Sequence, residues 1–194
     1  MLGAALIVGG LLLVAGRPPV AFVQPAPVES VAVSLAPAVS GTPSSSPVGP
    51  AATRDPRAPI PTGYRIQMPR LGIDLPIAEG DVARDIDQQK TPENFAFHLP
   101  GSAIPEQGSN TYFYAHARTG MFLTLWNARP GDQIFISTPD LRVLTYVVQD
   151  VQPRVPPSDV SWIQPTPSER LTLQTSTGPN SGDPRFVVVA VPAN

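Results

Sequence analysis

Residues 171–176, LTLQTS, and residues 185–190, RFVVVA, are two apolar runs rich in β-branched side chains. The loop between them contains Gly, Pro, Asn and Asp, the residues that favour tight turns. Together these features predict two neighbouring antiparallel strands. Their pairing would set Ser176, at the end of the first strand, close to Arg185, at the start of the second.

A third apolar run lies upstream at residues 112–116, YFYAH, and it ends in His116. A hydroxyl, an imidazole and a guanidinium at three strand ends are the components of an acyl-transfer site. They supply a nucleophile, a base and a cation that stabilises an oxyanion. We therefore take His116, Ser176 and Arg185 as the candidate catalytic residues.

At these residues the chain resembles the sortase family. The family pattern is a strand ending in His, a Thr-Leu-x-Thr-Cys strand, and an Arg that opens the next strand. Here the pattern reads Ala115-His116, then TLQTS at 172–176, then Arg185, so that Ser176 stands where the family has its catalytic Cys. Weaker matches in the same order, within a resemblance that covers residues 61–192, are MPRLGI at 68–73, PGSA at 100–103 and Gly-Asp at 131–132.

The resemblance implies an all-β fold, a closed eight-stranded β-barrel with short helices on its connections. It also implies a cell-surface transpeptidase that cleaves a sorting-motif peptide through an acyl-enzyme and passes the acyl group to an amine acceptor of the cell envelope. Trp162 lies in the connection that borders the substrate groove in the family, and is either a wall of that groove or an anchor for the loop. The candidate substrate-binding residues are Trp162, Thr175 and Ala115, whereas His98 matches no catalytic position of the family and is expected to be structural.

Ser176 leaves it open whether the protein is an enzyme. A cysteine thiol has a pKa of ~8.5 and is partly ionised near neutral pH, whereas a serine hydroxyl needs a well-placed base. In a serine triad a carboxylate orients the histidine, and the local candidates here are Asp183 and Asp159. We therefore expect low or absent transpeptidase activity. Two alternatives stay open: an inactive sortase-fold module that binds an extended peptide, and a purely structural envelope domain.

The pattern of the whole domain supports a strand-rich fold. From residue 60 onward, short alternating or β-branched runs recur between turn residues, which is typical of an all-β barrel or sandwich. Short helices are expected at residues 81–89 and 121–128. The expected strands are residues 64–68, 75–78, 95–98, 111–115, 133–137, 143–151, 171–176 and 186–191.

Composition excludes several classes of function. The pI of about 5.6 gives no basic surface for nucleic acid. The 194 residues include no cysteine, which rules out disulfides and thiolate metal sites. The sequence has no phosphate loop and no dinucleotide fingerprint, and we expect neither a cofactor nor a metal. Asp81, Asp85 and Asp87 would bind Ca²⁺ only if their carboxylates converged.

The N-terminal part of the chain differs from the rest in composition. Residues 1–16 are apolar and uncharged, and as a helix would reach about 24 Å against a hydrocarbon core of ~30 Å. We interpret residues 1–23 as a membrane anchor or signal segment, residues 24–60 as a disordered linker rich in Pro, Ala and Ser, and residues 61–194 as the sortase-like domain. This organisation implies a single-pass cell-membrane protein with an extracytoplasmic domain, or a secreted one if the segment is cleaved.

Overall fold

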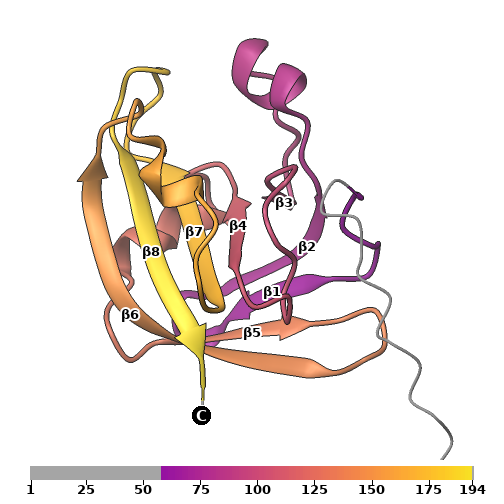
Figure 1. The fold of residues 1–194 in the computed structure, drawn as a ribbon. Coiled ribbons are helices and arrows are strands. Elements are labelled where there is room, and N and C mark those ends of the chain that lie inside the picture. The colour runs from indigo at the N-terminus through magenta and orange to yellow at the C-terminus, as the bar shows by residue number, and fades with distance from the viewer. Residues whose placement is uncertain (1–57, 194) are drawn as a thin grey trace, which may run out of the picture. The chain divides into compact units, whose positions relative to one another are not determined.

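The computed structural model describes residues 58–193 (Figure 1). The segments interpreted as an anchor and a linker fall almost wholly outside these residues, so both interpretations stay predictions. Between residues 58 and 193 no helix has the length and apolar character needed to cross a membrane.

Eight strands form a closed barrel in the order β1-β2-β3-β4-β7-β8-β6-β5, with β5 pairing back onto β1 (Figure 1). The β2–β3 and β4–β7 pairs are parallel, and the remaining pairs are antiparallel. This confirms the expected eight-stranded barrel. The strands are β1 (Arg65–Met68), β2 (Ile73–Glu79), β3 (Ala96–His98), β4 (Asn110–Tyr114), β5 (Gln133–Ser137), β6 (Val143–Val155), β7 (Arg170–Ser176) and β8 (Arg185–Pro192).

The helical turns are shorter and more numerous than the sequence predicts. Two lie inside the expected helices: the π-type turn η2 (Ala83–Asp87) and the 3-10 helix η3 (Phe122–Asn127). Two more 3-10 turns were not expected, η1 (Pro69–Leu71) and η4 (Val160–Ile163). Turns of three or four residues carry no periodic apolar pattern, which is why the sequence does not reveal them.

Strand β6 extends four residues beyond its expected end at residue 151, and it runs through Pro153. Its pairing with β8 shifts register between Val148 and Asp150 and again between Gln152 and Val155. An irregular ladder tolerates a proline, because a bulged residue needs no ladder N–H. The long connection predicted from residue 152 to 170 is accordingly shorter, and it contains η4.

Alternation along the strands separates the barrel interior from its outer face. Phe113 on β4, Leu173 on β7 and Val188 on β8 are all fully buried in one core cluster. Burying each of these side chains contributes roughly 1.5–3 kcal/mol. Because successive strand residues point to opposite faces, the neighbours of these residues point outward. The outer face of β4, β7 and β8 therefore carries Tyr112, Tyr114, Gln174, Ser176 and Arg185.

Candidate active site

Ser176 and Arg185 meet where β7 ends and β8 begins. They are direct partners in the antiparallel register, and Arg185 Nη1 lies 3.4 Å from Ser176 Oγ. The loop of residues 177–184 makes this pairing possible, because it reverses the direction of the chain between β7 and β8. The structure thus brings together the predicted nucleophile and the predicted oxyanion cation.

The hydroxyl of Ser176 bonds within its own loop. It donates a hydrogen bond of 2.5 Å to the backbone carbonyl of Gly178, and it accepts a weaker one of 3.3 Å from the N–H of Gly178. Serine side chains commonly form such local turns with the backbone two residues on. The hydroxyl proton is therefore directed at a carbonyl oxygen rather than at a base.

Arg185 also holds the loop that follows Ser176. Its Nη1 donates to the carbonyl of Asp183 over 2.7 Å, and its Nη2 donates to the carbonyl of Ser181 over 2.9 Å. Its charge extends over the outer face of the sheet: burial raises the pKa of Tyr112, and the charges of Arg185 and Arg170 oppose that rise. A fixed guanidinium on this face is suited to stabilise a developing oxyanion.

His116 lies two residues beyond the end of β4, on the same rim as Ser176. The parallel register pairs Tyr114 with Gln174, and two contacts continue it: Ala115 donates its N–H to the Gln174 carbonyl over 3.2 Å, and Thr175 Oγ1 donates to the Ala115 carbonyl over 2.9 Å. Continued by one more residue, this register sets His116 opposite Ser176.

The imidazole of His116 is engaged elsewhere. Its Nε2 lies 2.8 Å from the backbone carbonyl of Thr91, on the connection between β2 and β3. Among residues 58–193 no hydrogen bond joins His116 to Ser176 or to Arg185. The three candidate catalytic residues thus share one rim, but the imidazole is not bonded to the hydroxyl.

Neither candidate carboxylate orients His116. Asp183 Oδ2 accepts from the backbone N–H of Asn180 over 2.7 Å, inside the β7–β8 loop. Asp159 accepts from Ser161 and, over 3.1 Å, from the indole N–H of Trp162. Both carboxylates bond within their own loops, so neither Asp183 nor Asp159 acts as the acid of a serine triad at His116.

Thr175 and Ala115 hold strands together. Thr175 is 1% exposed and Ala115 is 6% exposed, and the hydrogen bond from Thr175 to the Ala115 carbonyl links β7 to the end of β4. Both side chains face the barrel interior. Substrate contact by either residue stays a prediction.

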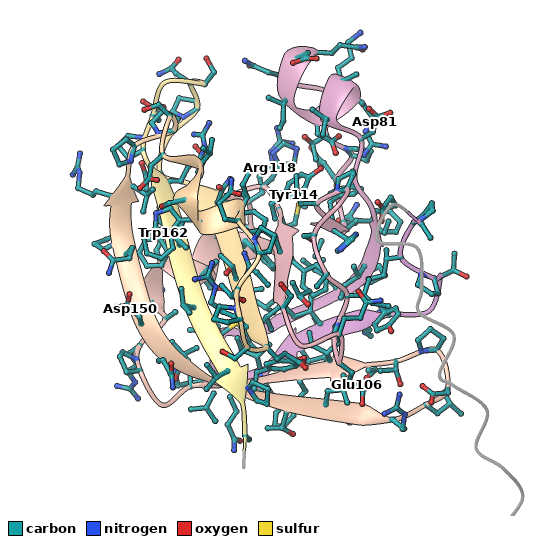
Figure 2. All side chains as sticks on the ribbon, in the orientation of Figure 1. Asp81, Glu106, Tyr114, Arg118, Asp150 and Trp162 are labelled. Carbon is teal, nitrogen blue, oxygen red and sulfur yellow. The ribbon has the colours of Figure 1, made fainter. Side chains whose placement is uncertain are left out.

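Trp162 packs on the barrel wall. Its ring lies against Val155, Val187 and Val189, and its backbone carbonyl accepts from Asn110 Nδ2 over 2.8 Å. Figure 2 shows Trp162 on one side of β7, with Tyr114 and Arg118 on the other. These contacts are those of a loop anchor, and a role as a groove wall stays a prediction.

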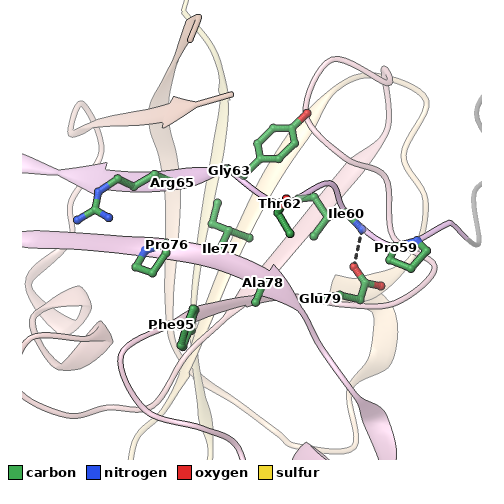
Figure 3. A pocket seen from close by; sticks show the side chains of 11 residues that line it. Pro59, Ile60, Thr62, Gly63, Arg65, Pro76, Ile77, Ala78, Glu79 and Phe95 are labelled. Carbon is green, nitrogen blue, oxygen red and sulfur yellow. Dashed lines mark hydrogen bonds between the residues drawn. The ribbon is translucent and has the colours of Figure 1, made fainter. Parts of the chain in front are cut away.

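His98 belongs to a buried polar network. Its Nδ1 lies 2.8 Å from Glu79 Oε2, and its Nε2 lies 2.9 Å from Ser102 Oγ. The same carboxylate oxygen accepts the backbone N–H of Ile60 over 2.8 Å (Figure 3). A histidine that is 1% exposed and bonded on both nitrogens has the structural role expected for it.

The pocket drawn in Figure 3 lies apart from the candidate catalytic residues. Its lining includes Ile60, Tyr64, Ile77 and Phe95, at the ends of β1 and β2. None of His116, Ser176 and Arg185 borders it. This pocket is therefore not part of the candidate site.

Within the part of the chain that the structure describes, no three His, Asp or Glu side chains are grouped so as to hold a metal ion. The carboxylate of Asp85 is instead engaged by Arg84 and Tyr114. Asp81 contributes its backbone N–H to that same carboxylate over 3.0 Å. The carboxylates of Asp81, Asp85 and Asp87 therefore do not converge in the described part of the chain.

Sequence reasoning missed one residue at this rim. The indole N–H of Trp126, on η3, donates to the backbone carbonyl of Ser176 over 3.2 Å, and Trp126 is 42% exposed. The available signal was a large aromatic residue inside a short predicted helix, which by itself does not indicate which strand end it reaches.

Comparison with known proteins agrees with the fold and with the strand-end pattern. The family model described as a Sortase domain matches residues 66–193, and the chain therefore belongs to the sortase family. A comparison with curated protein sequences gives no match.

Solved structures of sortases are similar to this chain. A lid mutant of sortase A from Corynebacterium diphtheriae has a TM-score of 0.58 and 28% identity, and the match covers 71% of this chain and 73% of that one. Sortase C-1 from Actinomyces oris has a TM-score of 0.58 and 24% identity, and the match covers 69% of this chain and 73% of that one. Sortase A from Listeria monocytogenes has a TM-score of 0.58 and 20% identity, and the match covers 69% of this chain and 88% of that one. The last two matches support the fold alone.

Proposed function

We propose that this domain binds an extended sorting-signal peptide on the outer face of β4, β7 and β8 and presents a peptide carbonyl to Ser176. The observation that carries the proposal is the contact of Ser176 with Arg185 at one strand end, in a chain that belongs to the sortase family. A nucleophile beside a fixed cation is the arrangement that acyl transfer requires.

In the proposed reaction, Ser176 Oγ attacks the peptide carbonyl and its proton passes to His116. The guanidinium of Arg185 stabilises the resulting oxyanion. His116 then returns the proton to the leaving amine as the intermediate collapses to an acyl-enzyme ester. An amine of the cell envelope attacks that ester, forms a new amide bond and restores the serine hydroxyl.

We expect this reaction to be slow. The hydroxyl of Ser176 must give up its hydrogen bond to the Gly178 carbonyl before His116 can accept its proton. Neither Asp183 nor Asp159 bonds to His116, so neither carboxylate stabilises the imidazolium as the acid of a serine triad would. A serine without such a base is a much weaker nucleophile than a cysteine thiolate.

A second candidate function is peptide binding without turnover. The loop contacts of Ser176 and Arg185 favour it, because both side chains are bonded to backbone carbonyls of residues 178–183. In this case the outer face of the sheet holds a partner peptide, and residue 176 serves the loop. The envelope location and the membrane segment at residues 1–23 are common to both candidates.

The test is incubation of the full chain with a library of sorting-motif peptides and an amine acceptor, followed by mass spectrometry. Transpeptidase activity predicts a cleaved peptide, an amide product, and an acyl adduct on the tryptic peptide containing Ser176. The Ser176→Ala variant is the control, and it should bind the same peptides without forming the adduct. Binding without cleavage or adduct would favour the second candidate, and absence of binding would contradict both.

A further inference from the structure

The connection between β2 and β3, residues 80–95, lies over the outer side of β4 and contacts His116. The contact is direct: His116 Nε2 lies 2.8 Å from the backbone carbonyl oxygen of Thr91. A carbonyl oxygen can only accept a hydrogen bond, so the ring nitrogen facing it must carry the proton. In a neutral imidazole the other nitrogen, Nδ1, then holds the lone pair.

We infer that the Thr91 carbonyl is a positioning group for His116. It holds the neutral imidazole as the Nε2–H tautomer and leaves Nδ1 as the nitrogen that accepts a proton from residue 176. The inference rests on the proposed function for its catalytic meaning, but the tautomer itself is a property of the folded chain. A backbone carbonyl here takes the orienting part that a carboxylate has in a serine triad, without the negative charge.

The carbonyl of Thr91 is held in place through Asp85. Thr91 Oγ1 donates to the backbone carbonyl of Asp85 over 3.4 Å, and the Asp85 carboxylate accepts from Tyr114 Oη over 2.5 Å. Tyr114 lies on β4, two residues before His116 and on the same outer face. The hydrogen bond between Tyr114 and the Asp85 carboxylate thus links residues 80–95 to the strand that leads to His116. We call this link the tie.

Several features make this tie rigid. Asp85 is 8% exposed, and its carboxylate also accepts from Arg84, whose guanidinium carbon lies 5.1 Å from the ring centre of Phe97. At the start of the connection, a Cβ on Gly80 would lie 2.2 Å from Tyr114 Oη, so only glycine allows this close approach. The connection therefore contacts Tyr114 at two separate points.

The pKa shifts of Asp85 and Tyr114 agree with the hydrogen bond between them. Burial acts to raise the pKa of Asp85, but hydrogen bonds from Arg84 and Tyr114 outweigh it and keep the pKa below its ordinary value. Burial and the bond to Asp85 raise the pKa of Tyr114. At neutral pH the carboxylate is therefore charged and the phenol protonated, as the hydrogen bond requires.

A separate ion pair, between Arg118 and Glu93, joins the far end of the connection to the turn after His116. Both side chains are more than half exposed, so screening by solvent makes this pair weak. The tie between Asp85 and Tyr114 is for that reason the one to test.

The direct test is nuclear magnetic resonance of the ¹⁵N-labelled full chain at about pH 8.5, where an ordinary imidazole is neutral. The chain has two histidines, so His116→Gln assigns the two ring systems. The inference predicts the Nε2–H tautomer for His116, with the hydrogen on the nitrogen that faces Thr91. An Nδ1–H tautomer, or an even mixture of the two, would overturn it.

The tie is tested by Tyr114→Phe, with Tyr146→Phe as a matched control. Tyr146 also donates its phenol hydrogen to a carboxylate, that of Glu169, but that carboxylate lies outside residues 80–95. Tyr114→Phe should shift His116 toward a mixture of tautomers, and Tyr146→Phe should not. If a folded Tyr114→Phe keeps the pure Nε2–H form, the tie does not position His116.

A second readout separates this inference from the proposed function. In a Ser176→Cys background, Tyr114→Phe should lower kcat about tenfold, because a disordered tautomer loses part of the ~10²–10⁴-fold effect of a general base. The KM should stay unchanged. If no variant cleaves any peptide while the tautomer behaves as predicted, the proposed function fails and the positioning of His116 stands. If cleavage occurs but the tautomer is Nδ1–H, the positioning inference alone fails.

Discussion

The indole N–H of Trp126 donates a hydrogen bond to the backbone carbonyl of Ser176, with 3.2 Å between nitrogen and oxygen. The carbonyl of Gln174 accepts from Ala115 on the β4 side, and the carbonyl of Ser176, two residues on, faces the same way. Strand β4 has ended at this point, so Trp126 takes the place of the next strand N–H. The carbonyl of the candidate nucleophile is thus held by a side chain from η3.

Trp126→Phe should loosen the end of β7 while keeping an aromatic ring. Loss of one hydrogen bond to a backbone carbonyl typically costs about 1 kcal/mol, which lowers the Tm of a domain of this size by ~3 °C. Thermal unfolding followed by circular dichroism measures the change. A Tm equal to that of the parent would mean that the indole bond contributes nothing in solution.

Arg185→Lys should free the β7–β8 loop. A lysine keeps the positive charge but lacks the planar fork that donates to the carbonyls of Ser181 and Asp183 at once. We expect limited proteolysis within residues 177–184 to be roughly tenfold faster, as for a local opening made easier by about 1.4 kcal/mol. Arg154→Lys, on β6, serves as the control. Equal cleavage of the two variants would contradict the loop-holding role of Arg185.

Glu79→Ala should destabilise the barrel strongly. The carboxylate of Glu79 bonds both His98 Nδ1 and the N–H of Ile60, so its removal leaves two donors without this partner. Breaking hydrogen bonds to a charged group costs about 1.5–3 kcal/mol. Urea unfolding should show this loss, and Asp140→Ala, in an exposed ion pair with Arg142, should show no comparable loss. A Glu79→Ala protein as stable as the parent would exclude a structural role for the network.

Acid should weaken the contact between η1 and the segment before β5. A hydrogen bond from Arg70 lowers the pKa of the Asp132 carboxyl, which is buried. A group with a depressed folded-state pKa stabilises the protein above its unfolded-state pKa of ~3.9, and this stabilisation is lost as pH falls through the folded-state value. Asp132→Asn should therefore be less stable than the parent at pH 7, with a gap that narrows below about pH 4. A gap that stays constant with pH would contradict the assignment.

The strands follow from local pattern, because short alternating or β-branched runs of four to nine residues indicate them, and this pattern favours a barrel or a sandwich. The closed eight-stranded barrel was predicted from the resemblance to sortases. The pairing of Ser176 with Arg185 was also predictable, since only a short loop of turn residues separates their strands. The contact of His116 with Thr91 was not, because 25 residues separate them and no periodicity marks a backbone carbonyl. Trp162 shows the same limit: one aromatic side chain suits a groove wall or an anchor equally well until its neighbours are known.

The role of Ser176 as a nucleophile is tested by Ser176→Cys, compared with the native chain by kcat/KM on the same sorting-motif peptide. In the family pattern His116 and Arg185 accompany a cysteine, and neither Asp183 nor Asp159 bonds to His116 as the acid of a serine triad would. We expect Ser176→Cys to cleave the peptide at least ~10²-fold faster, equivalent to about 2.7 kcal/mol of barrier, with little change in peptide affinity. A native protein that turns over the peptide as fast as Ser176→Cys would contradict this expectation, because Ser176 would then have an effective base.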